Sequence, residues 1–245
     1  MFYFNQIVLG LIRAMSSSSC SKHENDNESS LKNQQAINSD KEFSPQLLQL
    51  ANETDQILHH SIGDMSLEEI LSLETKQIVA NMIYSIRPEQ LQAANAPFNK
   101  AAGMAANQWN IRKRIFLFCP TGSDQEIKVI FNPKYKPVIL LTENHGDKSK
   151  SESTNFAREG CFSVPCAFGT VERYTNIEIS YIDDKGVEHR NEQLSGWQAR
   201  VWQHETDHLN GILYSNRQSD IDKGPNCTEF HRFQTKDEME KSNPK

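Results

Sequence analysis

Hydrophobic residues recur with the period of an α-helix in two stretches of this chain. The first stretch begins at Ser66, which forms the capping-box pattern of a helix start with Glu69 three residues later. Apolar residues then follow mostly three or four positions apart, at Ile70, Leu73, Ile78, Val79, Met82 and Ile83. We expect one amphipathic helix here, ending at Arg87-Pro88, because the residue before a proline disfavours helical dihedral angles.

The second helical stretch lies near the end of the apolar part of the chain. Trp197, Val201, His204 and His208 are spaced three or four residues apart, and Leu209 extends the same side. One face of this stretch is therefore apolar apart from its two histidines. We expect a core helix that buries this whole face, including Trp197.

Strand patterns occupy the sequence between the two helices. Short apolar runs predict buried strands at Arg114 to Phe118, at Ile127 to Phe131 with an end at Asn132-Pro133, and at Val138 to Leu141. Alternation predicts a hairpin of Asn176 to Tyr181 and Val187 to Gln193 around a turn at Asp183 to Gly186. Residues 89–100 read as a loop with at most a short helical turn, and residues 142–158 as an exposed, mobile insertion.

The ends of the chain lack these patterns and are polar. We expect an extension over residues 1–45, a globular domain over residues 46–217 and a charged tail over residues 218–245, from which Phe230 and Phe233 could dock back onto the core. Short strands around one buried helix, with the first helix packed outside, make an α+β domain.

The N-terminal extension is compatible with more than one cellular compartment. Phe2 to Ile12 is apolar but too short to span a bilayer. The only early basic residue, Arg13, follows this run, whereas a secretory signal carries its basic residues before it. A disordered extension of a cytoplasmic protein is one interpretation, and a mitochondrial or plastid transit peptide over residues 1–22 is the alternative.

The charge and the cysteine content narrow the classes of protein to which this chain can belong. The formal net charge of -6 provides no basic footprint for nucleic acid. The five cysteines are an odd number without the spacing of a disulfide framework, so they fit a reducing compartment better than a secreted scaffold. At least one cysteine is therefore available as a metal ligand.

The stretch His204-Glu205-Thr206-Asp207-His208 is the part of the chain richest in side chains that can bind a metal ion or transfer a proton. On a helix, His204 and His208 would lie on one face with Cβ atoms about 5–6 Å apart, close enough to bind one metal ion at roughly 2.1 Å each. Glu205 would lie beside the ion, where it can accept a proton from an attacking water and pass it to a leaving group. Two packed, hydrogen-bonded core histidines are the alternative for so short a pattern.

Two other segments carry candidate site residues. In Gly103 to Gln108, small residues permit a close approach of backbone or ligand and Gln108 offers an amide donor, although tight packing alone produces the same pattern. Cys161, within Glu159 to Pro165, is either an inert core thiol or the third ligand of a site with one position open for water.

These three segments, GMAANQ, EGCFSVP and HETDHLNG, resemble in order and spacing the three signature motifs of the peptide deformylases. The resemblance extends from about Asp55 to Tyr214. It implies the same α+β fold, with antiparallel strands surrounding a central metal-binding HExxH helix and an N-terminal helix packed outside. It also implies a metal-dependent hydrolase that removes the N-formyl group from the N-terminal methionine of newly made polypeptides and releases formate.

The resemblance assigns the metal site to Cys161, His204 and His208. The ion it implies is Fe²⁺ in the cell, with Zn²⁺, Ni²⁺ or Co²⁺ able to take its place. A thiolate-bound ferrous ion should be oxygen-sensitive, because the sulfur that binds it is itself oxidisable. The implied partners are N-formylmethionyl nascent polypeptides, with ribosome association as a further expectation and no direct contact with nucleic acid or membrane.

The resemblance also implies catalytic and substrate-binding roles. Glu205 would act as general base and then as general acid, while the side-chain amide of Gln108 and the backbone N–H of Phe162 would stabilise the oxyanion. Gly103 would give the formyl carbon a place that a bulkier acetyl group would clash with. Arg173 would contact the backbone or carboxylate of the peptide substrate, and an ordinary surface arginine is the alternative.

Five positions depart from the family pattern. Ala101 stands where glycine is usual, Asn107 where proline is frequent, Trp109-Asn110 where an aliphatic residue and glycine are common, and Phe162 where leucine is usual. A catalytically impaired or redirected relative that binds nascent chains or another N-blocked peptide is therefore the alternative. A zinc endopeptidase is disfavoured, because Tyr214 occupies the place of the third histidine of the pattern HExxHxxGxxH.

Overall fold

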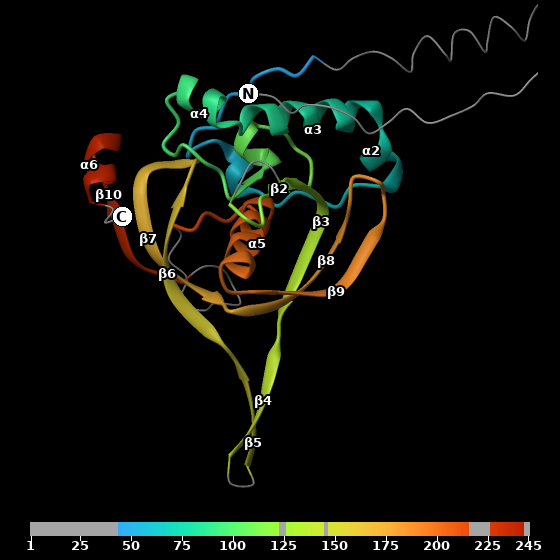
Figure 1. The fold of residues 1–245 in the computed structure, drawn as a ribbon, viewed down its shortest axis with the longest axis vertical. Coiled ribbons are helices and arrows are strands. Elements are labelled where there is room, and N and C mark those ends of the chain that lie inside the picture. Colours follow the sequence, from blue (N-terminus) through green and yellow to red (C-terminus); the bar gives the residue numbers. More distant parts are fainter. Residues whose placement is uncertain (1–43, 123–125, 145–146, 216–225, 243–245) are drawn as a thin grey trace, which may run out of the picture. The chain divides into compact units, whose positions relative to one another are not determined.

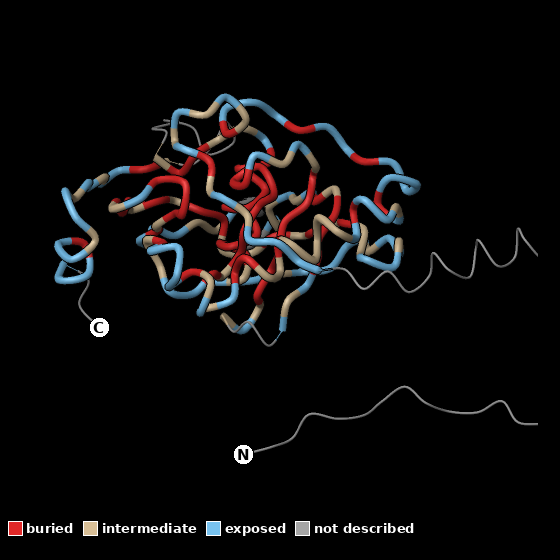
Figure 2. Tube along the Cα trace, turned by 90° about the horizontal axis from the view of Figure 1, so that it is seen from above, coloured by how far each residue is buried: buried red, intermediate tan, exposed pale blue. Residues whose placement is uncertain are grey.

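The computed structural model describes residues 44–122, 126–144, 147–215 and 226–242 of the chain. These residues belong to one compact unit, Phe43–Lys245. The helix α5 (Gly196–Leu209) lies at the centre of this unit, with strands on two sides and smaller helices above it (Figure 1). Buried residues concentrate around α5 (Figure 2). The predicted α+β fold around a central HExxH helix is confirmed.

An antiparallel five-stranded sheet packs on one side of α5, in the order β1-β2-β3-β8-β9. Its strands are β1 (Gly103–Ala105), β2 (Ile115–Phe118), β3 (Lys128–Pro137), β8 (Asn176–Ile182) and β9 (Glu188–Ser195). Alternation along β8 turns Ile177, Ile179 and Tyr181 into the core, where they pack in one cluster with Trp202 of α5. The hairpin predicted from this alternation is present.

The predicted end of a strand at Asn132-Pro133 is wrong, because β3 continues to Pro137. Asn132 has φ 50°, and the pairing of β3 with β8 shifts register between Phe131 and Lys134. A bulge of this kind absorbs an extra residue without ending the strand. The proline therefore lies within a strand instead of terminating it.

A second antiparallel sheet, in the order β10-β7-β6, closes the other side. It contains β6 (Thr154–Cys161), β7 (Val164–Tyr174) and β10 (Asn226–Arg232). A separate hairpin, β4 (Ile139–Asn144) and β5 (Asp147–Glu152), projects away from the body of the unit (Figure 1). The segment predicted as an exposed, mobile insertion, residues 142–158, thus contains most of this hairpin and the start of β6.

The C-terminal end also differs from the expected charged tail. Residues 226–232 form β10 on the edge of β7, and α6 (Lys236–Lys241) follows. Phe230 packs against Tyr214 and Phe233 against Phe168, so two aromatic side chains and one sheet edge hold a segment whose apolar residues are too few to show a periodic pattern. The docking of both phenylalanines is confirmed, and the description of residues 226–242 as a tail is wrong.

Several helices cover the top of the unit, and the predicted capping box starts one of them, α2 (Leu67–Leu71). These elements are η1 (Gln56–His59), α2, α3 (Leu73–Ser85), α4 (Pro88–Ala93) and η2 (Ala106–Trp109). Ser66 and Glu69 cap each other's backbone N–H groups. The single helix expected from Ser66 onward is broken, because Ser72 is extended and caps α3 by accepting a hydrogen bond from Thr75 N.

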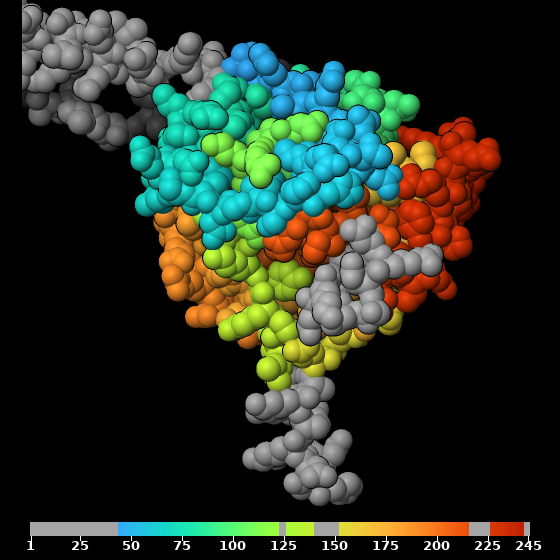
Figure 3. Space-filling view, turned by 180° about the vertical axis from the view of Figure 1, so that it is seen from behind, coloured from blue at the N-terminus to red at the C-terminus, as the bar shows by residue number. Residues whose placement is uncertain are grey.

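The segment before α2 ties these helices to α5. Ala51 N donates to Gln108 O at 2.8 Å, and Ile62 N donates to Leu209 O at 2.9 Å. A Cβ on Gly211, which has φ +76°, would lie 2.6 Å from the backbone N of His60. Figure 3 shows this segment, in blue to cyan, on the face of the unit that also carries the red C-terminal residues. Among the described helices, none is long and apolar enough to cross a bilayer.

Candidate metal centre

Three side chains that could hold a metal ion converge between the second sheet and α5. Cys161 ends β6, and His204 and His208 lie one turn apart on α5. His208 Nε2 lies 3.2 Å from Cys161 Sγ and 3.2 Å from His204 Nε2. The three ligand atoms all lie within 4.8 Å of one another. A thiolate and two imidazoles fit a mononuclear site for a divalent transition metal that keeps one position open.

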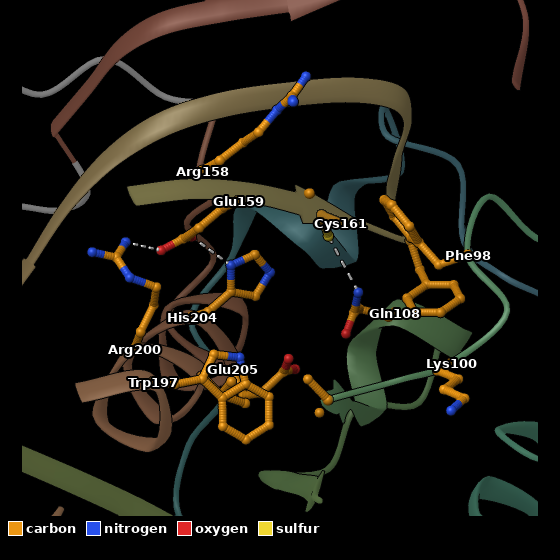
Figure 4. A pocket seen from close by; sticks show the side chains of 15 residues that line it. Phe98, Lys100, Gln108, Arg158, Glu159, Cys161, Trp197, Arg200, His204 and Glu205 are labelled. Carbon is orange, nitrogen blue, oxygen red and sulfur yellow. Dashed lines mark hydrogen bonds and ion pairs between the residues drawn. The ribbon is translucent and has the colours of Figure 1, made fainter. Parts of the chain in front are cut away.

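A buried ion-pair network fixes the orientation of His204. Glu159 Oε2 lies 2.8 Å from His204 Nδ1, so the carboxylate accepts the Nδ1 proton and leaves Nε2 to face the other ligands (Figure 4). Arg173 donates two hydrogen bonds of 3.0 Å to Glu159, and Arg200 donates a third of 2.7 Å. Arg173 also pairs with Asp207 of α5. The ligand is therefore held by charged groups that are themselves fully paired.

The charges in this network follow from the neighbours of each group. Burial alone would raise the pKa of the Glu159 carboxyl, but Arg173 and His204 hold that pKa well below its usual range. Burial lowers the pKa of His208 well below its ordinary value, and the neighbouring His204 and Arg173 add to the effect. Glu159 therefore supplies a fixed negative charge behind the imidazole of His204. The imidazole of His208 keeps a free electron pair.

The first motif places an amide donor beside the ligands. Gln108 lies in η2 directly after β1, and its Oε1 accepts a hydrogen bond from Ala105 N at 2.8 Å. This contact leaves Nε2 directed at Ser163 Oγ, 3.2 Å away, and at Cys161 Sγ, 3.5 Å away. Phe162 lies between these two residues in the tight turn from β6 to β7. The Gln108 amide and the Phe162 backbone therefore flank the same ligand.

Glu205 projects from α5 into the space beside the ligands, against Gly103 of β1. A Cβ on Gly103 would lie 2.6 Å from Glu205 Cγ, so only glycine leaves room for the carboxyl. Glu205 Oε2 has no hydrogen-bond partner within the described part of the chain. Burial raises the pKa of this carboxyl to about 7, against the opposing effect of His204. Glu205 is thus a buried carboxyl with one oxygen free to bind another group.

A pocket opens above these groups and leads to the surface. Glu205, Gln108 and Gly103 line its buried part, and Phe98, Lys100 and Trp197 lie nearer the surface (Figure 4). Trp197 was expected in the core, but its side chain is 47% exposed. Its place in the first turn of α5 explains the difference, because that turn extends beyond the cover of the sheets. The helical spacing was right, and the extent of the buried face was wrong.

Two other residues of the sequence analysis lie behind the pocket. Arg173 is 3% exposed and is not among the residues that line the pocket, so the structure does not bring it to a bound peptide. Asn107, one of the departures from the family pattern, donates from its amide to the His208 carbonyl at 2.6 Å. This departure therefore ties η2 to the metal helix. Glu159 was missed as a site residue, although its place two residues before Cys161 was a signal.

A cysteine and two histidines around an open position, with the free carboxyl of Glu205 on the same helix as the histidines, are the groups that metal-dependent hydrolases use. The family model for polypeptide deformylase matches residues 47–224. The chain therefore belongs to the polypeptide deformylase family.

Similar proteins support the assignment in sequence and structure. "Peptide deformylase 1A, chloroplastic" of Solanum lycopersicum is 33% identical, over 66% of this chain and 56% of that protein. The peptide deformylase of Rhodopirellula baltica is 39% identical, over 47% of this chain and 51% of that protein. The match thus spans about half the length of these two relatives. The class I type b peptide deformylase of Acinetobacter baumannii superimposes with a TM-score of 0.55 at 28% identity, covering 71% of this chain and 99% of that one.

Proposed function

We propose that this chain removes the N-formyl group from the N-terminal methionine of newly made polypeptides and releases formate. The observation that carries the proposal is the convergence of Cys161, His204 and His208 at one open position. Glu205 and Gln108 lie beside that position, as hydrolysis of a small amide requires. Family membership supports the same reaction, and the pocket above the site offers room for an extended peptide end.

The three ligand residues would hold one divalent ion, and we propose Fe²⁺, with Zn²⁺, Ni²⁺ or Co²⁺ as possible substitutes. When bound, the ion would polarise the formyl carbonyl and make the attacking water more acidic. Glu159 would keep His204 oriented for the ion through its contact of 2.8 Å with Nδ1. The thiol of Cys161 is only 3% exposed, and this burial would shield the oxidisable sulfur.

The residues around the open position would divide the remaining work. Glu205 would accept the proton of the attacking water at its free Oε2 and deliver a proton to the departing nitrogen. Gln108 would redirect its Nε2 donor from Ser163 toward the oxyanion. The hydrogen bond from Ala105 N to Gln108 Oε1 would keep the amide beside the site. The backbone N–H of Phe162 would add a second donor.

Selectivity for formyl would come from the floor of the pocket. Gly103 already leaves so little space beside Glu205 that an added Cβ would lie 2.6 Å from its side chain. An acetyl group carries one more carbon than a formyl group at the reacting centre, and a close-packed floor resists even one methyl group. We propose that N-acetyl peptides are poor substrates for this reason.

The proposed partners are N-formylmethionyl nascent chains, met at the ribosome. Relatives include a protein named as chloroplastic and a bacterial protein, which agrees with either a cytoplasmic or an organellar site of action. We propose the cytoplasm, with a mitochondrion or plastid as the alternative if residues 1–22 direct import. These residues lie outside the described part of the chain.

Formate release tests the proposal directly. Protein loaded anaerobically with Fe²⁺, and in parallel with Zn²⁺, Ni²⁺ or Co²⁺, is given a formyl-Met peptide. We expect formate from the wild type and neither stoichiometric metal nor formate from Cys161→Ala. Stoichiometric metal in the wild type without formate release would instead favour a relative that only binds blocked peptides.

A further inference from the structure

The C-terminal segment, residues 226–242, reaches the rim of the pocket from behind. The family model ends at residue 224, so this segment lies beyond the part of the chain that the family shares. It nevertheless forms the outer strand of the sheet that carries Cys161, and the helix that follows β10 lies against β7.

Phe98 and Phe162 line one side of the pocket, and Phe168 packs behind Phe98; these three rings are called the aromatic wall. The ring of Phe98 lies 5.4 Å from that of Phe162 in an edge-on arrangement and 6.1 Å from that of Phe168. Gly160, next to the ligand Cys161, makes the arrangement possible, because a Cβ there would lie 2.6 Å from Phe98 Cζ and 3.0 Å from Phe168. The wall therefore rests directly on the strand that carries the metal ligand.

The C-terminal segment holds this wall at two points. The ring of Phe233 lies 6.3 Å from that of Phe168, and Phe233 N donates to Cys166 O at 2.8 Å. Lys236 Nζ donates to Ala96 O at 2.7 Å, two residues before Phe98. Phe233 thus supports the back of the wall, and Lys236 fixes the loop that carries Phe98.

A third contact closes the arrangement on the solvent side. The guanidinium of Arg158 lies 4.1 Å from the centre of the Phe168 ring, on which it stacks. Its Nη1 also donates to Ser242 O at 3.4 Å, at the end of α6. Phe168 is therefore held between the C-terminal segment and a pocket-lining arginine, within one packed cluster.

We propose that Phe98 is a specificity-determining residue of the substrate cleft, and that Phe233 and Lys236 are positioning residues that hold it there. The inference rests on the proposed function. The scissile amide would lie on the buried floor with Gly103 and Glu205, whereas Phe98 is only partly buried at the rim. The aromatic wall would therefore contact the peptide beyond its methionine. Trp197 borders the pocket from α5, so the peptide would leave between two aromatic side chains (Figure 4).

A positioning role predicts an effect on KM that depends on the length of the substrate. In Phe233→Ala and Lys236→Met, we expect KM for a formyl-Met tripeptide to rise about 3- to 10-fold, the size that one aromatic contact is worth. Formyl-Met amide, which lacks the residues beyond methionine, should show an unchanged KM. For both substrates, kcat should stay within about twofold, because the floor of the pocket is untouched.

The experiment measures kcat and KM for both substrates with metal-loaded full-length protein. Lys236→Arg keeps a donor to the Ala96 carbonyl and should restore the tripeptide KM. Phe156→Ala is the matched aromatic control, because Phe156 is 50% exposed on β6 and does not line the pocket. Hydrogen exchange, followed in the same variants, should become about threefold faster or more at residues 94–102 and stay unchanged in α5.

The outcomes separate the inference from the proposed function. An active wild type whose tripeptide KM is the same in Phe233→Ala, Lys236→Met and Phe156→Ala would overturn the inference. Equal KM increases for both substrates would also overturn it, since the wall would then not be contacting the peptide beyond methionine. If metal-loaded wild type releases no formate, the proposed function fails and the substrate role falls with it, whereas faster exchange at residues 94–102 would still report the mechanical link.

Discussion

Replacing Glu159 with glutamine should destabilise the protein far more than an ordinary surface substitution. Glu159→Gln keeps the size of the side chain but removes a negative charge that Arg173, Arg200 and His204 share. Arg173 is 3% exposed and would retain only Asp207 as a charged partner. Breaking a buried ion pair costs about 3–5 kcal/mol. Because Asp207 remains, we expect the lower end, a loss of about 3 kcal/mol in the free energy of unfolding.

Urea unfolding of metal-free protein at neutral pH measures this loss. The matched control is Glu178→Gln, the same chemical change at a surface pair, where Glu178 Oε1 lies 2.8 Å from Lys136 Nζ. That pair should be worth less than about 1 kcal/mol. Metal binding by Glu159→Gln should weaken about 10- to 100-fold, because His204 loses its orienting carboxylate. A loss below about 1 kcal/mol, or equal losses in the two variants, would refute the role given to the buried network.

Two other predictions follow from individual contacts. Gly103→Ala places a Cβ 2.6 Å from Glu205 Cγ, so kcat should fall at least about 100-fold with metal content unchanged; an alanine variant as active as the wild type would contradict the close approach. The hydrogen bond to Asp183 raises the pKa of His189, burial opposes this shift, and Glu192 adds to it. Because a raised pKa stabilises the folded protein at low pH, His189→Gln should lose more stability near about pH 6 than above about pH 8. Thermal unfolding across this range checks the sign, and a larger loss at high pH would be the contrary result.

The metal helix and the strand hairpin could be predicted because their signals are local. The spacing of His204 and His208 fixes one helix face whatever surrounds it, and alternation along Asn176 to Tyr181 fixes which side faces the core. The capping box at Ser66 likewise depends on a contact only three residues long. The break at Ser72 was missed, because an apolar spacing that continues across a second cap hides it.

The features that were missed depend on contacts between distant parts of the chain. Glu159 acquires its role from Arg173, Arg200 and His204, which lie 14, 41 and 45 residues away. Its place two residues before Cys161 is a local signal, but the sequence does not show these distant partners. The C-terminal strand is missed for the same reason, since Asn226–Arg232 is stabilised by the edge of β7 more than by its own apolar content. The exposure of Trp197 likewise depends on where the surrounding sheets end.

The central claim is that Glu205, beside the Cys161, His204 and His208 site, hydrolyses a formyl amide. The most direct measurement is formate or acetate release from formyl-Met and acetyl-Met forms of one peptide, by wild type and Glu205→Gln with equal bound metal. We expect the wild type to deformylate the first peptide and to leave the second nearly untouched, and Glu205→Gln to be about 100- to 10,000-fold slower. Full activity in Glu205→Gln, or equal rates on the two peptides, would contradict the account.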